Sequence, residues 1–273
     1  MTSRLLLGLL AAGALTAAPL LDPNLTEFPS SSLVDFGARL DSPGGFLTVD
    51  ERGRFVWPDG RRARFWGINV AAESVFQPPE RIDTCIARIR EAGFNLVRLH
   101  HIDDRERGIL AGDGPGVEFD PARLRLLDYW VDRLGAAGIS IYLDLLDYRW
   151  FDTGRLGRAA KPYAVFDPEL IARQQEYARA LLREHRNAFN GRAYADDPAI
   201  VLLELFDENG LFIRRADWPN LLEPYRSDLT ARWNRYLLQR YGSSEGLAAA
   251  WARSGVAQPL PAGQLCEEGT VPL

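Results

Sequence analysis

Amphipathic helix patterns alternate with short apolar runs through the middle of this chain. Residues 78–94 repeat Ile82, Ile86 and Ile89 at helical spacing and stop at Gly93, and the strand-like run "NLVRLHHID" follows directly. Likewise "FDPARLRLLDYWVDRLGAAG" precedes "ISIYLDLL", and "DPELIARQQEYARALLREH" precedes "AIVLLELFDEN". This alternation, with nearly continuous apolar strands, predicts a parallel β-sheet covered by helices.

Two architectures share this pattern, the open doubly wound sheet and the (β/α)₈ barrel. The first expected strand, residues 64–70, lacks a following G-x-G-x-x-G or G-K-[ST] segment, so nucleotide binding loses most of its support. Polar residues instead collect at the expected carboxyl ends of strands, which in a barrel face one mouth. These residues are Asn69, Arg98, His100, His101, Asp144, Asp147, Asp207 and Glu208.

We therefore predict an α/β fold of the (β/α)₈ TIM-barrel type, apparently truncated after about four β/α units. The stretch "GFLTVDERGRFVWPDGRRARFWGINV" has short alternating runs separated by turn signals, and it predicts a small N-terminal β-meander. Residues 45–216 would form the N-terminal part of the barrel together with this meander. Residues 217–273 would form a helical insertion, with Leu229, Trp233, Tyr236 and Leu237 on one face, and a truncated tail rich in Pro and Gly.

The N-terminal residues resemble a processing segment. Residues 1–18 combine Arg4, the apolar run "LLLGLLAAGAL" and small residues, which predicts a secretory signal peptide. A permanent anchor is the weaker alternative, because a bilayer span needs roughly 20 apolar residues. We predict a lead segment over 19–44, a secreted or periplasmic location, and no membrane contact after signal cleavage.

Composition excludes some partners. The chain has 32 basic and 37 acidic residues without a long basic block, so we expect no nucleic-acid binding. Cys85 and Cys266 belong to no metal-like motif, and a disulfide between them stays open. We expect no cofactor and no metal, and the oligomeric state stays open.

The strand that ends near Glu208 suggests acid chemistry. If its side chains alternate, Glu204 and Glu208 project to the same face, and Arg98 is the natural partner for a buried Glu204. A carboxylic acid at the rim, desolvated by Phe206 and Phe212, can stay protonated near neutral pH, as a general acid requires. The alternatives are a structural role for Glu204 and a turn-capping role for Glu208.

The order of these motifs resembles a known enzyme family. "RFWGINV", "GFNLVRLHHID", "LDYWVDRLGAAGISIYLDLL" and "DPAIVLLELFDENGLF" are similar to the first half of a clan-A retaining glycoside hydrolase, and most similar to the cellulase- and mannanase-like enzymes of glycoside hydrolase family five. The resemblance covers roughly residues 45–212. It implies an exported enzyme acting on a β-linked polysaccharide or oligosaccharide, with Glu208 as the general acid/base. The expected substrate-binding residues are Asp207, Arg98, His100, His101, Asn69, Trp150 and Phe212.

The chain departs from the family pattern in three places. Asp207 stands where the family has Asn, and an ionised Asp accepts hydrogen bonds but cannot donate one. Residues 144–147 are "DLLD" where the family commonly has histidine, so His100 or His101 would take that role. A retaining enzyme also needs a second carboxylate about 5–5.5 Å from the first. The resemblance places that nucleophile on a later strand, and we expect these 273 residues alone to be inactive.

Two other functions compete with the hydrolase. One is a non-catalytic carbohydrate-binding pseudo-enzyme or half-barrel fragment, which would hold polysaccharide with aromatic rings. Those rings are Tyr148, Trp150, Tyr163, Phe212 and Trp218. The other is a metal-dependent hydrolase using His100, His101, Asp103 and Asp144. It is the weaker candidate, because adjacent histidines point to opposite faces while they remain in a strand.

Overall fold

The computed structural model describes residues 35–37, 40, 44–104, 106–112, 116–149, 151, 163–208, 211–212, 218 and 220–273. The predicted signal peptide over 1–18, most of the lead segment over 19–44, and Trp150 lie outside the described residues.

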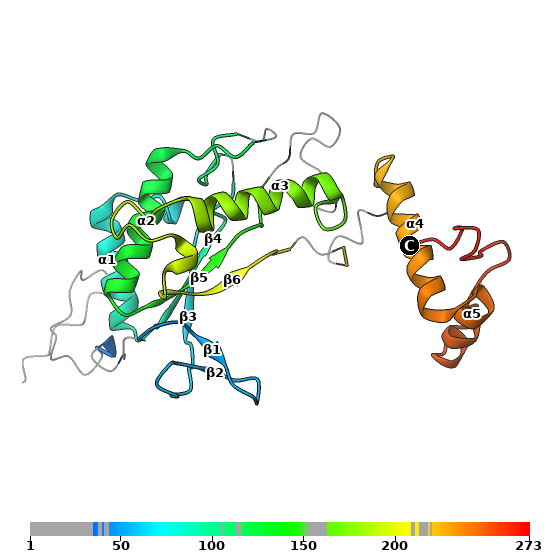
Figure 1. The fold of residues 1–273 in the computed structure, drawn as a ribbon, viewed down its shortest axis with the longest axis horizontal. Coiled ribbons are helices and arrows are strands. Elements are labelled where there is room, and N and C mark those ends of the chain that lie inside the picture. The colour runs from blue at the N-terminus through cyan, green and yellow to red at the C-terminus, as the bar shows by residue number, and fades with distance from the viewer. Residues whose placement is uncertain are drawn as a thin grey trace, which may run out of the picture.

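The main sheet has four parallel strands that neighbour one another in chain order (Figure 1). They are β3 (Gly67–Ala71), β4 (Leu96–His100), β5 (Ser140–Asp144) and β6 (Ile200–Glu204). Consecutive strands of a (β/α)₈ barrel have this order, whereas a doubly wound sheet reverses its order at a switch point. The predicted fold class is therefore confirmed. A small antiparallel hairpin, β1 (Thr48–Val49) and β2 (Phe55–Val56), precedes the sheet and forms the predicted meander.

Three helices connect the strands. They are α1 (Pro79–Glu91), α2 (Pro121–Ala136) and α3 (Pro168–Arg179), and α3 continues into a π-helical turn over Ala180–Glu184. Each begins with proline at its first turn, where the missing N–H costs nothing. Asp120 caps α2 by accepting from the backbone N–H groups of Ala122 and Arg123, and Asp167 caps α3 in the same way.

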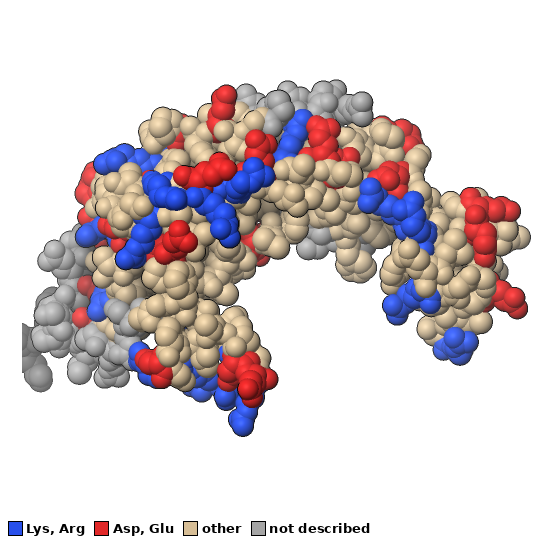
Figure 2. Space-filling view, viewed as in Figure 1, with Lys and Arg blue, Asp and Glu red and all other residues tan. Residues whose placement is uncertain are grey.

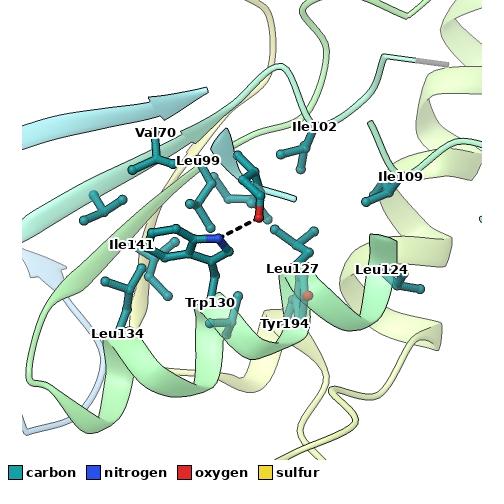
Figure 3. Close-up of a cluster of buried hydrophobic side chains, with 14 of the residues drawn as sticks. Val70, Leu99, Ile102, Ile109, Leu124, Leu127, Trp130, Leu134, Ile141 and Tyr194 are labelled. Atoms are coloured by element: carbon teal, nitrogen blue, oxygen red, sulfur yellow. Dashed lines mark hydrogen bonds between the residues drawn. The ribbon is translucent and has the colours of Figure 1, made fainter. Parts of the chain in front are cut away.

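The principal hydrophobic core lies between these helices and one face of the sheet. Val97, Leu99, Ile141 and Leu143 from the central strands are fully buried there. Trp130 of α2 lies among them, and its indole Nε1 donates a 2.7 Å hydrogen bond to the carbonyl of Val75 (Figure 3). One face of each central strand is therefore committed to packing.

Strand β6 ends earlier than the sequence pattern suggests. It stops at Glu204, and its pairing with β5 contains a register shift between Ile141 and Tyr142. Asp207 stays beside the extension of β5 through a 2.9 Å bond from its N–H to the Leu146 carbonyl. Glu208 has φ 53°. The expectation that Glu204 and Glu208 alternate along one strand was wrong, because a left-handed residue interrupts the pleat.

Two further helices follow, α4 (Tyr225–Tyr241) and α5 (Ser244–Arg253), and they are set apart from the sheet in Figure 1. Leu237 of α4 and Leu247 of α5 share a small core with Cys266 and Val271 of the tail. The Pro- and Gly-rich tail therefore packs against the helices. Tyr236 was wrongly expected on the buried face and is 46% exposed, because the buried stripe follows a spacing of four residues.

A second apolar cluster links the start of α4 to the segment before α3. The rings of Tyr163 and Tyr225 lie 4.4 Å apart, and Tyr163 is buried. The Tyr163 hydroxyl accepts a 2.9 Å hydrogen bond from the N–H of Leu222. Tyr163 is thus a packing residue, and the suggestion that it faces a sugar was wrong.

Three remaining features bear on the predictions. Cys85 and Cys266 are free thiols, so the open question of a disulfide between them is resolved. In the part of the chain that the structure describes, we find no helix with the length and hydropathy of a bilayer span. On the face shown in Figure 2, acidic and basic side chains are interspersed.

Candidate active site

One face of the main sheet is covered by helices α1, α2 and α3, and the opposite face is polar. Because side chains alternate along a strand, residues next to the buried Val97, Leu99, Ile141 and Leu143 project to this second face. We call it the open face; it carries Asn69, Arg98, His100, Tyr142, Asp144 and Glu204. Asn69 is exposed and lies beside Arg98 in the register of β3 and β4. Alternate residues of each strand therefore form the hydrophobic core on one face and the charged groups on the other.

Arg98 is the central cation of the open face. Its Nε donates to Glu204 Oε2 at 2.8 Å, its terminal nitrogen also contacts that oxygen, and the same nitrogen lies 3.0 Å from Asp207 Oδ2. The expected Arg98 and Glu204 pair is therefore present. Burial lowers the pKa of Arg98, but the bonds to Asp207 and Glu204 outweigh it and raise the pKa overall. Arg98 stays charged and fixes Asp207 beyond the end of β6.

His100 and Asp144 form a buried pair at the carboxyl ends of β4 and β5. His100 Nδ1 lies 2.6 Å from Asp144 Oδ2. Burial raises the pKa of Asp144 to about 6, and the charge of Asp103 adds to that rise despite the opposing effects of His100 and Arg98. Asp144 is 1% exposed, and its Oδ1 has no hydrogen-bond partner among the described residues.

His101 joins the same cluster because it has left the strand. Its φ is 59°, β4 ends at His100, and the two imidazole rings lie 3.8 Å apart between centroids. His101 Nε2 is 2.5 Å from Asp147 Oδ2. The argument that adjacent histidines would face opposite ways therefore fails, since its premise was an uninterrupted strand.

Asp103 organises the loop after β5. Its carboxylate is buried and accepts hydrogen bonds from the backbone N–H groups of Asp147, Tyr148 and Arg149, at 2.8 to 3.0 Å. Our sequence reasoning considered Asp103 only as a metal ligand and missed this role. The available signal was an acid that only Ile102 separates from the segment "LVRLHH", a position from which short polar side chains bond nearby backbone.

Arg149 anchors the same loop from the inside. It is buried, donates to the Arg173 carbonyl at 3.1 Å, and lies over the rings of Phe151 and Tyr177. Burial lowers the pKa of Arg149. The sequence reasoning did not single out this residue either.

Glu208 lies at the margin of this cluster and is exposed. Phe206 is 43% exposed and Phe212 is 74% exposed. The expected desolvation of Glu208 by these two rings is not seen among the described residues, because Glu208 itself is exposed and Phe212 lies largely in solvent. The Asp207 side chain, by contrast, turns inward to Arg98 and lies 3.5 Å from His100 Nε2.

The structure thus brings most of the predicted residues together. Arg98, His100, His101 and Asp207 are linked through Asp144, Asp147 and Glu204, and Asn69 lies beside Arg98 on the sheet. Glu208 follows Asp207 directly, Phe212 is exposed nearby in sequence, and Trp150 falls outside the described residues. An arrangement so rich in carboxylates and donors suits a polyhydroxylated ligand or a cation.

Comparisons with known proteins give likenesses in structure only. No family model matches the chain, and no curated protein matches it in sequence. The endo-1,4-β-mannanase of Rhizomucor miehei is similar at a TM-score of 0.48 and 17% identity, covering 59% of this chain and 48% of that one. The endo-β-1,4-mannanase of Thermotoga petrophila is similar at a TM-score of 0.45 and 18% identity, and the match covers 66% of this chain and 41% of that one. The exo-β-1,4-mannosidase of Opitutaceae bacterium strain TAV5 is similar at a TM-score of 0.37 and 25% identity, and the match covers 50% of this chain and 24% of that one.

This chain spans about half the length, or less, of the solved chains it matches. All three TM-scores lie below 0.5, so the assignment of residue roles depends on the geometry of this chain.

Proposed function

We propose that the protein is an exported glycoside hydrolase that cleaves a β-linked polysaccharide or oligosaccharide, with Glu208 as the general acid/base. The observation that supports this most is the placement of Glu208. It lies just beyond the carboxyl end of β6, directly after a residue that Arg98 holds, at the edge where barrel enzymes assemble their sites. A glutamate there can protonate a glycosidic oxygen of a sugar lying across the open face.

The polar residues of the open face would bind the sugar hydroxyls. Arg98 offers N–H donors, His100 Nε2 offers an acceptor when the ring is neutral, and Asn69 offers both a donor and an acceptor. Asp207 can accept a hydrogen bond from a sugar hydroxyl but, when ionised, cannot donate one. Phe212 and Trp150 would contribute aromatic rings, on which the apolar faces of sugars can pack.

A second carboxylate would act as the nucleophile of a retaining reaction. Asp207 and Glu204, the acidic residues nearest to Glu208 in sequence, are both bound by Arg98. An arginine-bound carboxylate is a weak nucleophile, because the ion pair stabilises its charged ground state. We therefore assign neither residue as the nucleophile.

The test is hydrolysis by the native gene product of β-1,4-linked manno- and cello-oligosaccharides, with reducing ends as the readout. Glu208→Gln should lower kcat by about 10²–10⁴, because it removes proton transfer while preserving shape. Glu184→Gln is the matched control, since Glu184 is an exposed glutamate at the end of the π-helical turn. Full activity of Glu208→Gln would overturn the assignment.

A carbohydrate-binding protein without turnover is the second candidate. The solvent exposure of Glu208 favours it, because the general acids of glycosidases typically lie in apolar pockets. Calorimetric binding of the same oligosaccharides, unchanged in Glu208→Gln and without any hydrolysis, would support this candidate over the enzyme.

A further inference from the structure

Three acceptor atoms converge on one point of the open face. His100 Nε2 lies 3.5 Å from Asp147 Oδ2 and 3.5 Å from Asp207 Oδ2. His100, Asp144, Asp147 and Asp207 each offer one ligand atom, and these four atoms lie within 4.8 Å of one another. Distances of 3.5 Å are longer than ordinary hydrogen bonds of this kind, so the three atoms surround a position rather than bond each other.

The orientation of His100 makes Nε2 an electron-pair donor. Its Nδ1 lies 2.6 Å from Asp144 Oδ2, and because a carboxylate can only accept, Nδ1 carries the hydrogen. In the neutral ring the lone pair is then on Nε2, which faces Asp147 and Asp207. Metal-bound histidines usually have their second nitrogen bonded to a carboxylate in this way.

The cluster holds more acidic than basic side chains among the described residues. Four carboxylates, those of Asp144, Asp147, Glu204 and Asp207, lie within ion-pair distance of one arginine and two histidines among the described residues. Asp144 and Asp147 are each 1% exposed, and Asp144 Oδ1 makes no hydrogen bond in the described part of the chain. Buried negative charge of this kind is costly unless a cation compensates it.

The spacing suits a small first-row metal ion. Zn²⁺ binds imidazole nitrogen and carboxylate oxygen at about 2.0–2.2 Å, so tetrahedral ligand atoms are about 3.3–3.5 Å apart. An imidazole ligand favours zinc, iron, nickel or copper over the oxygen-seeking Mg²⁺ and Ca²⁺. His101 Nε2 lies only 2.5 Å from Asp147 Oδ2, too close for both atoms to share one metal. His101 therefore lies beside Asp147 as an ion-pair partner and is left out of the proposed ligand set.

We propose that His100 Nε2, Asp147 Oδ2 and Asp207 Oδ2 form a binding site for a first-row divalent cation such as Zn²⁺, with Asp144 orienting His100. Asp207 bridges this cation and Arg98, whose terminal nitrogen is 3.0 Å from the same oxygen. Three protein ligands leave one position open for water or a substrate oxygen. This inference goes beyond the hydrolase proposal and does not depend on it.

The test uses the whole protein, treated with EDTA and then freed of the chelator. Isothermal titration with Zn²⁺ should show one equivalent bound, and Co²⁺ should give a visible absorption band typical of four or five ligands. If the wild-type protein neither binds Zn²⁺ in the titration nor gives the Co²⁺ absorption band, the proposal is overturned. Charge-transfer absorption from a thiolate would also overturn it, because the metal would then be bound by Cys85 or Cys266.

Substitutions locate the ion. His100→Gln and Asp147→Asn should weaken Zn²⁺ binding at least about 100-fold, and Asp144→Asn about 10–100-fold, as losses of ligands and of an outer partner do. His185→Gln is the matched control, because His185 forms a 2.8 Å pair with Asp128 away from the open face. Its affinity should be unchanged.

Unchanged affinity in His100→Gln and Asp147→Asn would overturn the proposed site. Circular dichroism establishes that each variant is folded, and the wild-type Co²⁺ spectrum decides the question if a variant does not fold. No substrate is needed, so failure here is distinct from failure of the hydrolase proposal.

Discussion

The two faces of the main sheet are made by the same four strands and have opposite chemistry. The helix-covered face contributes Val97, Leu99, Ile141 and Leu143 to the core, whereas the open face presents Arg98, His100, Asp144 and Glu204. Alternation with a period of two lets one short strand serve both. Stability is therefore concentrated on one side of the sheet and chemistry on the other, and substitutions should separate the two.

The largest effect on stability is expected at Trp130. Trp130→Ala removes a buried indole and leaves the Val75 carbonyl without its donor, which should cost about 3–5 kcal/mol of unfolding free energy. Trp66→Ala is the matched control, since Trp66 is 67% exposed. Urea unfolding measures both, and equal losses would contradict the claim that the core lies on the helix side.

Arg98 should be the most sensitive position of the open face. Arg98→Met leaves Glu204 and Asp207 without their shared partner, and because these groups are only partly buried we expect a loss of about 2–4 kcal/mol. The double variant Arg98→Met with Glu204→Leu removes one orphaned charge and should recover about half of the loss. A double variant no more stable than Arg98→Met, measured by the same urea unfolding, would refute this pairing.

Substitution of Asp103 should lower the unfolding free energy less than substitution of Arg98, but it should loosen the loop at residues 147–149 more. Asp103→Asn weakens charge-assisted bonds to the N–H groups of residues 147–149 and should cost about 1–3 kcal/mol. Amide hydrogen exchange at those residues should accelerate. Asp196→Asn, at an exposed aspartate, serves as the control. Unchanged exchange in Asp103→Asn would show that other contacts hold the loop.

The smallest effect concerns Cys85 on the sheet-facing side of α1. Burial raises the pKa of this half-buried thiol, so less thiolate exists at pH 8 than in a free cysteine. Alkylation by iodoacetamide should therefore be slower than that of glutathione and should accelerate as the pH rises towards 10. Alkylation at pH 8 as fast as that of glutathione would mean that this helix does not shield the thiol.

Periodicity made the fold predictable where it was regular. Ile82, Ile86 and Ile89 predicted the buried face of α1, and the apolar runs after each helix predicted β4, β5 and β6. The polar residues of the open face were predictable for the same reason, because they alternate with the apolar residues of those runs.

Local backbone conformation was not predictable from these patterns. His101 and Glu208 both have positive φ, and neither is glycine, so no residue type signalled the turn. Those two turns bring His101 beside His100 and take Glu208 out of the strand. The packing of the tail against α4 was missed for a related reason. It depends on bonds between Asn234 and Val271, 37 residues apart, and long-range pairs leave no periodic trace.

The role of Glu208 as a proton donor is the central claim, and leaving-group dependence tests it most directly. Aryl glycosides of the preferred sugar, covering phenols from acidic to weakly acidic, would be hydrolysed by the native gene product and by Glu208→Ala. We expect the variant to be nearly unimpaired on the most acidic phenol and to lose about 10²–10⁴ in kcat/KM on the least acidic one, which needs a proton to depart. An equal loss on every substrate would contradict this role.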